Sequence, residues 1–363
     1  MQFLYQNALF PLEEIQLKEI NDAATRLYSK LQMINVEFLN ISDYNKNYLG
    51  YHLKKLHSIL QKCSYILALS IGGMDISINN CTILDYGGGT GILSLLAKEL
   101  NFGTVLYNDI YDISCQDAKT IGSSIGNQAD YYIEGNIDEV IIFLKKNGIA
   151  CNSIVSDDVI EHIYDMGYFI KKLPELTDNR CSTIVMSSTA NSFNPYIVRS
   201  LKKVHYNAEF EDRKHYSGSK KRDALESYYS IRKRIIQIYC PDLNSYEIKE
   251  ITRRTRGMIE QDIINVVDDY LISKKFPLEP KHPTNTCDPY TGNWAEQLMN
   301  IVELKNQLQE VGFNSKIFPG YFGNMNKRGG IINNIIIPKI HTLINLPKYG
   351  VNFAPYFILY GRK

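Results

Sequence analysis

The sequence has little of what marks secreted or membrane-spanning proteins. Its seven cysteines are odd in number and scattered, and no two form a C-x-x-C pair. Neither a disulfide framework nor a zinc or other metal site is therefore expected, and the cysteines are interpreted as small buried residues of a reducing compartment. No apolar run approaches the roughly 20 residues of a membrane helix, and the first ten residues do not resemble a secretory leader. We expect a cytoplasmic protein.

The chain also lacks an overall charge excess. Its 40 basic and 39 acidic residues give a formal net charge of +1, and no known nucleic-acid module is found, so a nucleic-acid partner is disfavoured. Internal repeats and low-complexity linkers are missing as well. With 363 residues, of which 44% are hydrophobic, the chain can bury a large core.

The most informative segment is a glycine-rich turn between a predicted strand and a predicted helix. The apolar run Cys81 to Leu84 precedes Asp85-Tyr86-Gly87-Gly88-Gly89-Thr90-Gly91, and residues 92–98 follow with a helical pattern. Glycines at alternate positions permit φ > 0 and let backbone N–H groups approach a ligand, while the helix N-terminus adds partial positive charge. The turn is expected to hold an anionic group of a bound small molecule.

The glycine spacing discriminates between ligands. A dinucleotide fingerprint has its third glycine three positions after the second, and Ile92 stands there, which disfavours a Rossmann-type oxidoreductase. The run instead resembles motif I of the class I S-adenosylmethionine (SAM) dependent methyltransferases, whose loop wraps the methionine end of SAM. The resemblance implies SAM as cofactor and S-adenosylhomocysteine as product. A tight turn in another α/β protein is the alternative.

Later segments match the same family in order. A strand over 104–108 ends at Asp109, at the distance along the chain where a carboxylate holds ribose hydroxyls. A third strand over 131–135 ends at Asn136, which the resemblance places near the adenine, with Asp138 as a rival.

A fourth predicted strand, 153–156, leads into Asp157-Asp158-Val159-Ile160-Glu161-His162. This segment is similar to the acid-Val-Ile-Glu-His segment of ubiquinone-type O-methyltransferases, where it lies between SAM and the substrate. The resemblance implies a cofactor-binding set made up of Asp85, Tyr86, Gly87, Gly88, Gly89, Gly91, Asp109, Ile110, Asn136, Ile137 and Asp157.

Alternation of helical and strand patterns predicts an α/β protein with a doubly wound, Rossmann-like parallel sheet. The resemblance adds seven strands and an antiparallel hairpin at the C-terminal edge. The remaining expected elements are helices over 165–176 and 295–311, strands over 181–187, 312–318 and 356–360, and an apolar excursion over 331–346.

Four regions are expected. Residues 1–60 have helical spacing over 12–31 and 48–60, and they either cover the cofactor, form a homodimer face or pack on the core. Residues 61–190 form the SAM-binding core. Residues 191–294 are a helical insertion at the carboxyl ends of the strands, interpreted as a substrate lid. Residues 295–363 complete the core.

The insertion carries a local basic excess, with fourteen Lys/Arg against eight Asp/Glu between Leu201 and Arg256. Guanidinium groups match phosphate and carboxylate, which favours a phosphorylated, otherwise anionic or sugar-linked substrate. The alternative is a solvated helix face with partners such as Glu226 and Glu250. The basic runs are 213–215, 220–222, 232–234 and 253–256.

The end of the insertion contains Asp288-Pro289-x-Thr291-Gly292-x-Trp294. This stretch resembles one found in a family of uncharacterised bacterial class I methyltransferases. The alternative is an ordered loop that returns from the insertion to the core.

The implied chemistry is in-line methyl transfer to a hydroxyl or amine of a small molecule, with donor and acceptor aligned at about 3–3.5 Å. A hydroxyl acceptor needs a base, and His162 is the first candidate, with His205 and His215 as residues that could reach inward from the lid. Asp158 or Asp157 could orient an amine. A structural role for His162, and a SAM- or nucleotide-binding regulator without turnover, remain open.

Overall fold

The computed structural model describes residues 1–4, 12–73, 76–178, 182–212, 226–320 and 349–363. They divide into two compact units: the first comprises Met1–Ile160, Gly167–Thr189 and Asn300–Lys363, and the second comprises Glu161–Met166 and Ala190–Met299. Several predicted features lie outside the described residues, namely Cys181, His215, the basic runs 213–215 and 220–222, and the apolar excursion 331–346.

The first unit is built on a seven-stranded sheet of order β3-β2-β1-β4-β5-β7-β6. Strands β1 to β5 are parallel, while β7 is antiparallel to both of its neighbours, β5 and β6. The predicted α/β doubly wound sheet with an antiparallel C-terminal edge is confirmed. The strands are β1 (Thr82–Tyr86), β2 (Thr104–Asp109), β3 (Tyr131–Glu134), β4 (Ser153–Asp157), β5 (Thr183–Ser188), β6 (Asn314–Gly320) and β7 (Tyr356–Arg362).

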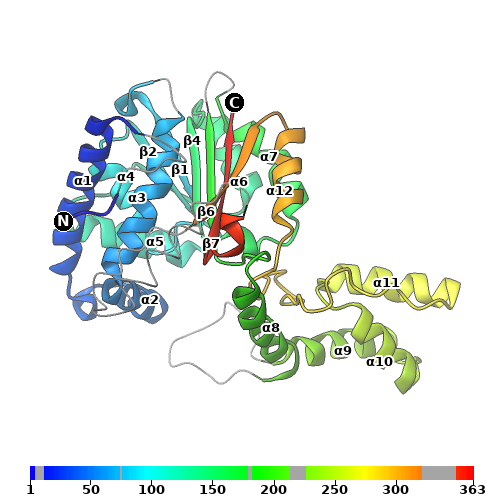
Figure 1. Cartoon of the computed structure of the whole chain (residues 1–363). Helices are drawn as coiled ribbons and strands as arrows, with labels where there is room; N and C mark the ends of the chain where they lie inside the picture. Colours follow the sequence, from blue (N-terminus) through cyan, green and yellow to red (C-terminus); the bar gives the residue numbers. More distant parts are fainter. Residues whose placement is uncertain (5–11, 74–75, 179–181, 213–225, 321–348) are drawn as a thin grey trace, which may run out of the picture. The chain divides into compact units, whose positions relative to one another are not determined.

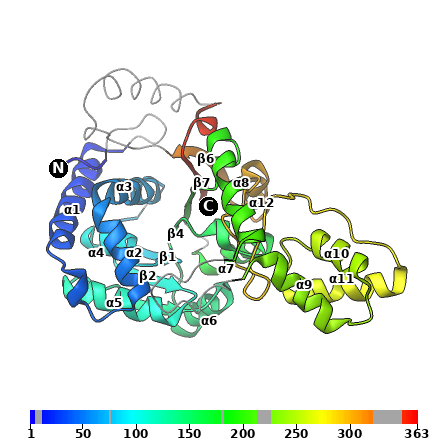
Figure 2. The ribbon, with the colours of Figure 1, turned by 90° about the horizontal axis from the view of Figure 1, so that it is seen from below.

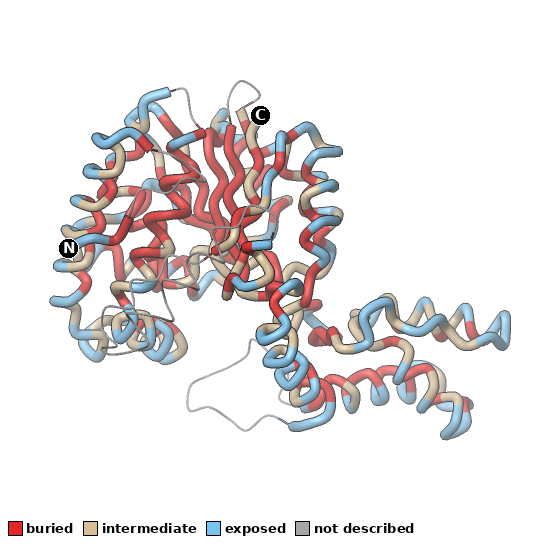
Figure 3. Tube along the Cα trace, in the orientation of Figure 1, coloured by how far each residue is buried: buried red, intermediate tan, exposed pale blue. Residues whose placement is uncertain are grey.

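Helices cover both faces of this sheet, so its central strands are buried. Helices α3 (Leu56–Gly72), α4 (Ile92–Glu99) and α5 (Asp112–Ser124) lie on one face (Figures 1 and 2). Helices α6 (Ile137–Asn147), α7 (Met166–Leu176) and α12 (Ile301–Glu310) lie on the other. The strands accordingly form the continuous buried interior of this unit in Figure 3, as parallel sheets require.

The N-terminal helices belong to the first unit, because α1 (Glu14–Gln32) packs on α3 and α4. The prediction of one helix over 48–60 is wrong. The structure has α2 (Asp43–Lys54) and α3, separated at Lys55, whose φ of −117° and ψ of 19° are not helical. The Ser42 hydroxyl caps α2 by accepting from the Asn45 N–H (3.3 Å), which fixes an earlier start than the apolar pattern predicts.

The prediction of a helix over 295–311 is also wrong at its start. Helix α12 begins at Ile301, after Asn300 accepts from the Glu303 N–H (3.3 Å) as its N-cap. Glu296 has a φ of 61°, which a right-handed helix does not allow. Leu298 and Met299 are buried from a loop and so extend the apolar pattern beyond the helix.

The second unit is helical, with α8 (Pro195–Phe210), α9 (Tyr228–Tyr239), α10 (Ser245–Arg254) and α11 (Glu260–Ser273). Asn194 and Asn244 cap α8 and α10 by accepting from backbone N–H groups of the first helical turn. Its apolar core is formed by residues such as Ile231, Ile251 and Val267. Short 3-10 helices elsewhere in the chain are Val36–Phe38, Ile78–Asn80, Ile160–His162 and Gly350–Asn352.

Two expectations from composition can be compared with the structure. The six cysteines in the described ranges are free of disulfides, and all except Cys240 are buried, as predicted. Within those ranges, no helix combines the length and the apolar character needed to cross a bilayer.

Candidate cofactor site and the charged clusters of the two units

The glycine turn has the backbone that its sequence predicts. Gly87, Gly89 and Gly91 have φ values of 72°, 54° and 79°. A Cβ on Gly87 would lie 2.6 Å from the Val159 side chain, and one on Gly88 would lie 2.6 Å from the Tyr107 ring. Gly87 is therefore required both for conformation and for space, Gly88 for space, and Gly89 and Gly91 for conformation.

Strand β2 holds this turn in place. The Gly88 N–H donates to the Asn108 carbonyl (2.9 Å), and the Tyr107 hydroxyl donates to the Gly89 carbonyl (2.6 Å). Gly91 then occupies the left-handed N-cap position of α4. The turn is thus fixed beside the carboxyl ends of β1 and β2, where open α/β sheets bind ligands.

Asp109 lies next to the glycine turn, as predicted. Its carboxylate accepts from the Gly89 N–H (3.2 Å) and from the Tyr111 N–H (3.0 Å), and its residue is only 8% exposed. A carboxylate fixed in this way at the end of the second strand can accept from the hydroxyls of a ribose.

Asp85 and Tyr86, the last two residues of β1, are buried and contact other residues of the protein. Asp85 Oδ2 accepts from the Ser94 N–H (3.0 Å) and the Ser94 hydroxyl (2.7 Å), which ties β1 to α4. Burial raises the pKa of Asp85 to about 7, against the opposing effect of the Ser94 bonds. The Tyr86 ring packs on Phe169, with ring centroids 5.0 Å apart.

The end of β3 contains a helix cap. Asn136 Oδ1 accepts from the Asp138 N–H (2.7 Å), and the Asn136 N–H donates to Glu139 (2.8 Å), which together form a capping box for α6. The amide oxygen expected to meet an adenine is therefore already bonded. Ile137 is buried, whereas Ile110 is 60% exposed and can contact a ligand.

A partly buried lysine joins the two aspartates at the end of β4. Lys62 Nζ lies 2.5 Å from Asp157 Oδ1 and 2.8 Å from Asp158 Oδ2. Asp157 also accepts from the Ser187 hydroxyl, and Asp158 accepts from the Thr189 N–H (2.9 Å). Since Val159 contacts Gly87, this cluster lies beside the glycine turn.

Burial and charge act in opposite directions on this cluster. Burial alone would lower the pKa of Lys62, but the two carboxylates hold it well above its usual value. Burial disfavours ionisation of Asp158, yet Lys62 holds its pKa below the ordinary range. For Asp157 burial dominates and the pKa is raised.

Two residues of helix α2 lie beside the glycine turn. The Tyr48 ring lies 3.3 Å from where a Cβ of Gly89 would be, and His52 Nδ1 lies 3.0 Å from the Thr90 hydroxyl. Burial lowers the pKa of His52 to about 4, so this histidine is neutral near pH 7.

Sequence reasoning missed Lys62, Tyr48 and His52 as members of the site. Lys62 did carry a signal, because it is the only lysine in α3 and no Arg, Asp or Glu accompanies it there. Tyr48 and His52 are four residues apart on α2, but no sequence pattern links them to the glycine turn.

The predicted base His162 lies in the second unit. Its Nδ1 is 2.8 Å from the Trp294 carbonyl oxygen, and its Nε2 is 3.8 Å from Glu296 Oε1. His205 is 1% exposed and its Nε2 is 2.7 Å from the Glu296 carbonyl oxygen, so it is packed inside this unit.

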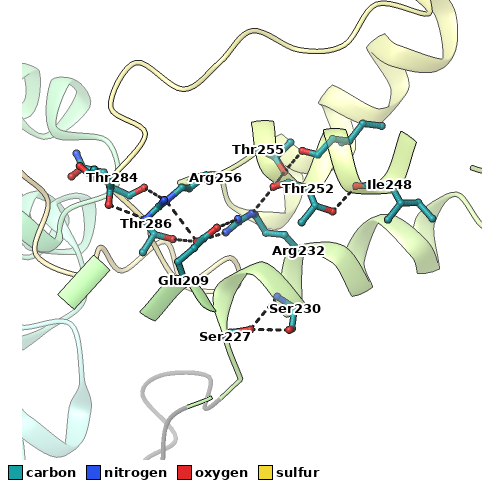
Figure 4. Close-up of polar contacts among 12 residues, drawn as sticks. Glu209, Ser227, Ser230, Arg232, Ile248, Thr252, Thr255, Arg256, Thr284 and Thr286 are labelled. Carbon is teal, nitrogen blue, oxygen red and sulfur yellow. Dashed lines mark hydrogen bonds and ion pairs between the residues drawn. The ribbon is translucent and has the colours of Figure 1, made fainter. Parts of the chain in front are cut away.

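The arginines predicted to bind an anionic substrate have internal partners. Arg232 is fully buried and pairs with Glu209, which also accepts from the Thr286 hydroxyl (2.6 Å) (Figure 4). Arg256 donates to the carbonyls of Thr284 (2.9 Å) and Asn285 (2.9 Å). Arg256 thus bonds the loop that returns from the insertion directly, and Arg232 is linked to that loop through Glu209.

The more exposed arginines pair as the alternative interpretation expected. Arg234 lies 2.5 Å from Glu226, and Arg254 lies 3.3 Å from Glu250. Arg253 bonds Glu250 and Glu279. The described arginines of the basic runs thus all form ion pairs within the unit.

No protein-family model and no curated protein matches the chain. Solved structures similar to it include a SAM-dependent methyltransferase from Agrobacterium tumefaciens (15% identity, 34% of this chain, 43% of that chain, TM-score 0.28). Another, from Mesorhizobium loti, has 11% identity over 79% of this chain and 94% of that chain, with a TM-score of 0.37. A Listeria monocytogenes protein assigned to the same class has 11% identity over 83% and 97%, with a TM-score of 0.38.

The chain spans less than half the length of the Agrobacterium protein and nearly the whole of the other two.

Proposed function

We propose that this protein is a SAM-dependent methyltransferase and that its first unit binds SAM at the turn Gly87–Gly91. The observation that carries the proposal is the fixed position of the Asp109 carboxylate against the Gly89 N–H at the end of β2. The glycine turn, the N-terminus of α4 and the Asp109 carboxylate together can bind an adenosyl ligand with a polar tail.

The charge around the turn favours SAM over a dinucleotide. Asp109 bonds the turn directly, and Asp157 and Asp158 lie beside it and share one lysine, Lys62. SAM carries a sulfonium and an ammonium against a single carboxylate, whereas NAD carries a diphosphate. An acid-rich site attracts the positive groups of SAM and repels the diphosphate of NAD.

Methyl transfer then requires little covalent chemistry from the protein. A lone pair of the acceptor attacks the methyl carbon in line with the breaking C–S bond, and the bonding electrons stay on sulfur as S-adenosylhomocysteine leaves. A hydroxyl acceptor also gives its proton to a base. The base role of His162 stays a prediction from the sequence, and Asp158, held ionised by Lys62, suits the orientation of a cationic amine.

The acceptor is proposed to be a hydroxyl or amine of a small molecule. The internal ion pairs of Arg232, Arg234 and Arg254 remove the reason to expect that they bind a phosphorylated or sugar-linked acceptor. The role of the insertion as a lid stays a prediction from its place in the chain, as do the site role of His215 and homodimer formation.

Calorimetric titration with SAM, S-adenosylhomocysteine and NAD tests the proposal. We expect binding of the first two and not of NAD, with at least tenfold weaker binding in Asp109→Ala. The matched control is Asp112→Ala, which removes an exposed aspartate from the first turn of α5. Binding of NAD alone, or equal affinities in both variants, would contradict the proposal. A SAM-binding protein without turnover would bind SAM but release no S-adenosylhomocysteine in an acceptor screen.

A further inference from the structure

Three side chains of types that commonly bind metal ions converge in the second unit. Glu161, His162 and Glu296 each direct a donor atom to one place, and these atoms all lie within 4.8 Å of one another. Glu161 is fully buried, whereas the side chains of His162 and Glu296 are 36% and 34% exposed. The cluster is therefore closed on one side and open to a ligand on the other.

The orientation of His162 points to a cation. A carbonyl oxygen only accepts, so the bond to the Trp294 carbonyl makes Nδ1 the protonated nitrogen. In the neutral ring, Nε2 then carries the lone pair and lies 3.8 Å from Glu296 Oε1, which is too long for a hydrogen bond. Two bonds of about 2.0–2.2 Å to one metal ion span up to about 4.4 Å, so this gap fits a shared ion. Metal-binding histidines commonly donate their other ring nitrogen to a carbonyl in this way.

Hydrogen bonds and a ring contact fix the backbone around the cluster. The Gln297 N–H donates to the Glu161 carbonyl (3.0 Å), and the Trp294 indole N–H donates to the Tyr164 carbonyl (3.3 Å). The Trp294 ring also stacks on the Tyr164 ring, with centroids 5.9 Å apart. The segment that bears Glu161 and His162 is thus fixed to the segment that bears Glu296, which pre-positions the donors.

We propose that Glu161, His162 and Glu296 bind one divalent cation of the Mn²⁺, Co²⁺ or Zn²⁺ type. One imidazole and two carboxylates, without a thiolate, suit these ions, and three protein ligands leave positions open for water or a substrate oxygen. The cation offsets the repulsion between the two neighbouring carboxylates. The site departs from the sequence-based expectation of no metal, because Glu296 lies 134 residues along the chain from His162.

Metal titration of the whole, tag-free chain after EDTA treatment and dialysis tests the site without methyl transfer. MnCl₂, CoCl₂ and ZnCl₂ are titrated by calorimetry, and Mn²⁺ is also followed by loss of the free-ion electron paramagnetic resonance signal. Co²⁺ should quench Trp294, the only tryptophan, whose carbonyl bonds His162. We expect one ion per chain and saturable quenching.

The variants Glu296→Gln and His162→Gln should each bind Mn²⁺ at least tenfold more weakly, while Glu260→Gln, at an exposed residue of α11, should bind it like the wild type. Circular dichroism checks that each variant is folded. Failure of all three ions to bind one per chain, or equal binding by all variants, would overturn the metal site. SAM binding is measured separately, so this outcome leaves the methyltransferase proposal unaffected.

Discussion

Two clusters of acidic and basic side chains, one in each unit, differ in burial and in charge balance. In the second unit, Arg232 and Glu209 are 0% and 2% exposed and pair with each other. In the first unit, Lys62 is 14% exposed and faces two aspartates that are 25% and 38% exposed. The Arg232–Glu209 pair has balanced charges and is closed to solvent. The Lys62 cluster has one positive charge for two carboxyl groups and is open to solvent. The comparison teaches that basic residues paired one to one inside a fold stabilise it, whereas a partly exposed cluster with an excess of one charge is the better candidate for a ligand site.

The largest effect is expected from Arg232→Met, which leaves the Glu209 carboxylate buried without its guanidinium. Loss of one member of a buried pair costs about 3–5 kcal/mol. Urea unfolding followed by the fluorescence of Trp294, which lies in the second unit, measures it. A control with Glu209→Gln added to Arg232→Met should recover part of the loss. A change in unfolding free energy below about 1 kcal/mol would show that the pair does not stabilise this unit as proposed.

A second effect is expected at the glycine turn of the first unit. Gly87→Ala adds a Cβ 2.6 Å from Val159 at a φ of 72°, so it should abolish SAM binding and cost about 2–3 kcal/mol of stability. Gly126→Ala is the matched control, since Gly126 has a φ of 66° but no atom within 4 Å of a built Cβ. It should cost only about 1 kcal/mol and leave binding intact. Equal behaviour of the two variants would contradict a steric role for Gly87.

A smaller, pH-dependent effect is expected at Asp85. Its folded-state pKa of about 7 exceeds the ordinary 3.8, so the folded state retains a proton that the unfolded state loses. The contribution of Asp85 to stability is then fully present below pH 3.8 and is lost as the pH rises through about 7. Asp85→Asn should flatten this decline between pH 5 and pH 8 by roughly 1 kcal/mol or more, measured by urea unfolding with circular dichroism. Parallel pH profiles for the variant and the wild type would refute the shift.

The smallest effect is expected for Arg234→Ala. Arg234 and Glu226 form a pair whose side chains are 44% and 48% exposed, and solvent screens such pairs. The change in unfolding free energy should stay below about 1 kcal/mol, and SAM binding should not change. A large loss of acceptor turnover in this variant would instead restore the anion-binding interpretation of the basic runs.

Features coded by neighbouring residues could be predicted from the sequence. The glycine turn, the strand before it and the carboxylate of Asp109 follow from local pattern and spacing, and the structure places them together. The partners of Lys62 and Arg232 could not be predicted, because Asp157 lies 95 residues from Lys62 and Glu209 lies 23 residues from Arg232. Such pairings depend on how helices pack, which periodicity alone does not specify.

Hydrogen–deuterium exchange with and without SAM tests the central claim most directly. The first unit should bind the cofactor through the turn, so SAM should slow exchange in peptides spanning 83–95 and 105–112. Peptides spanning 228–270, which carry the internally paired arginines, should exchange at unchanged rates. No protection by SAM, or protection confined to the second unit, would contradict the account.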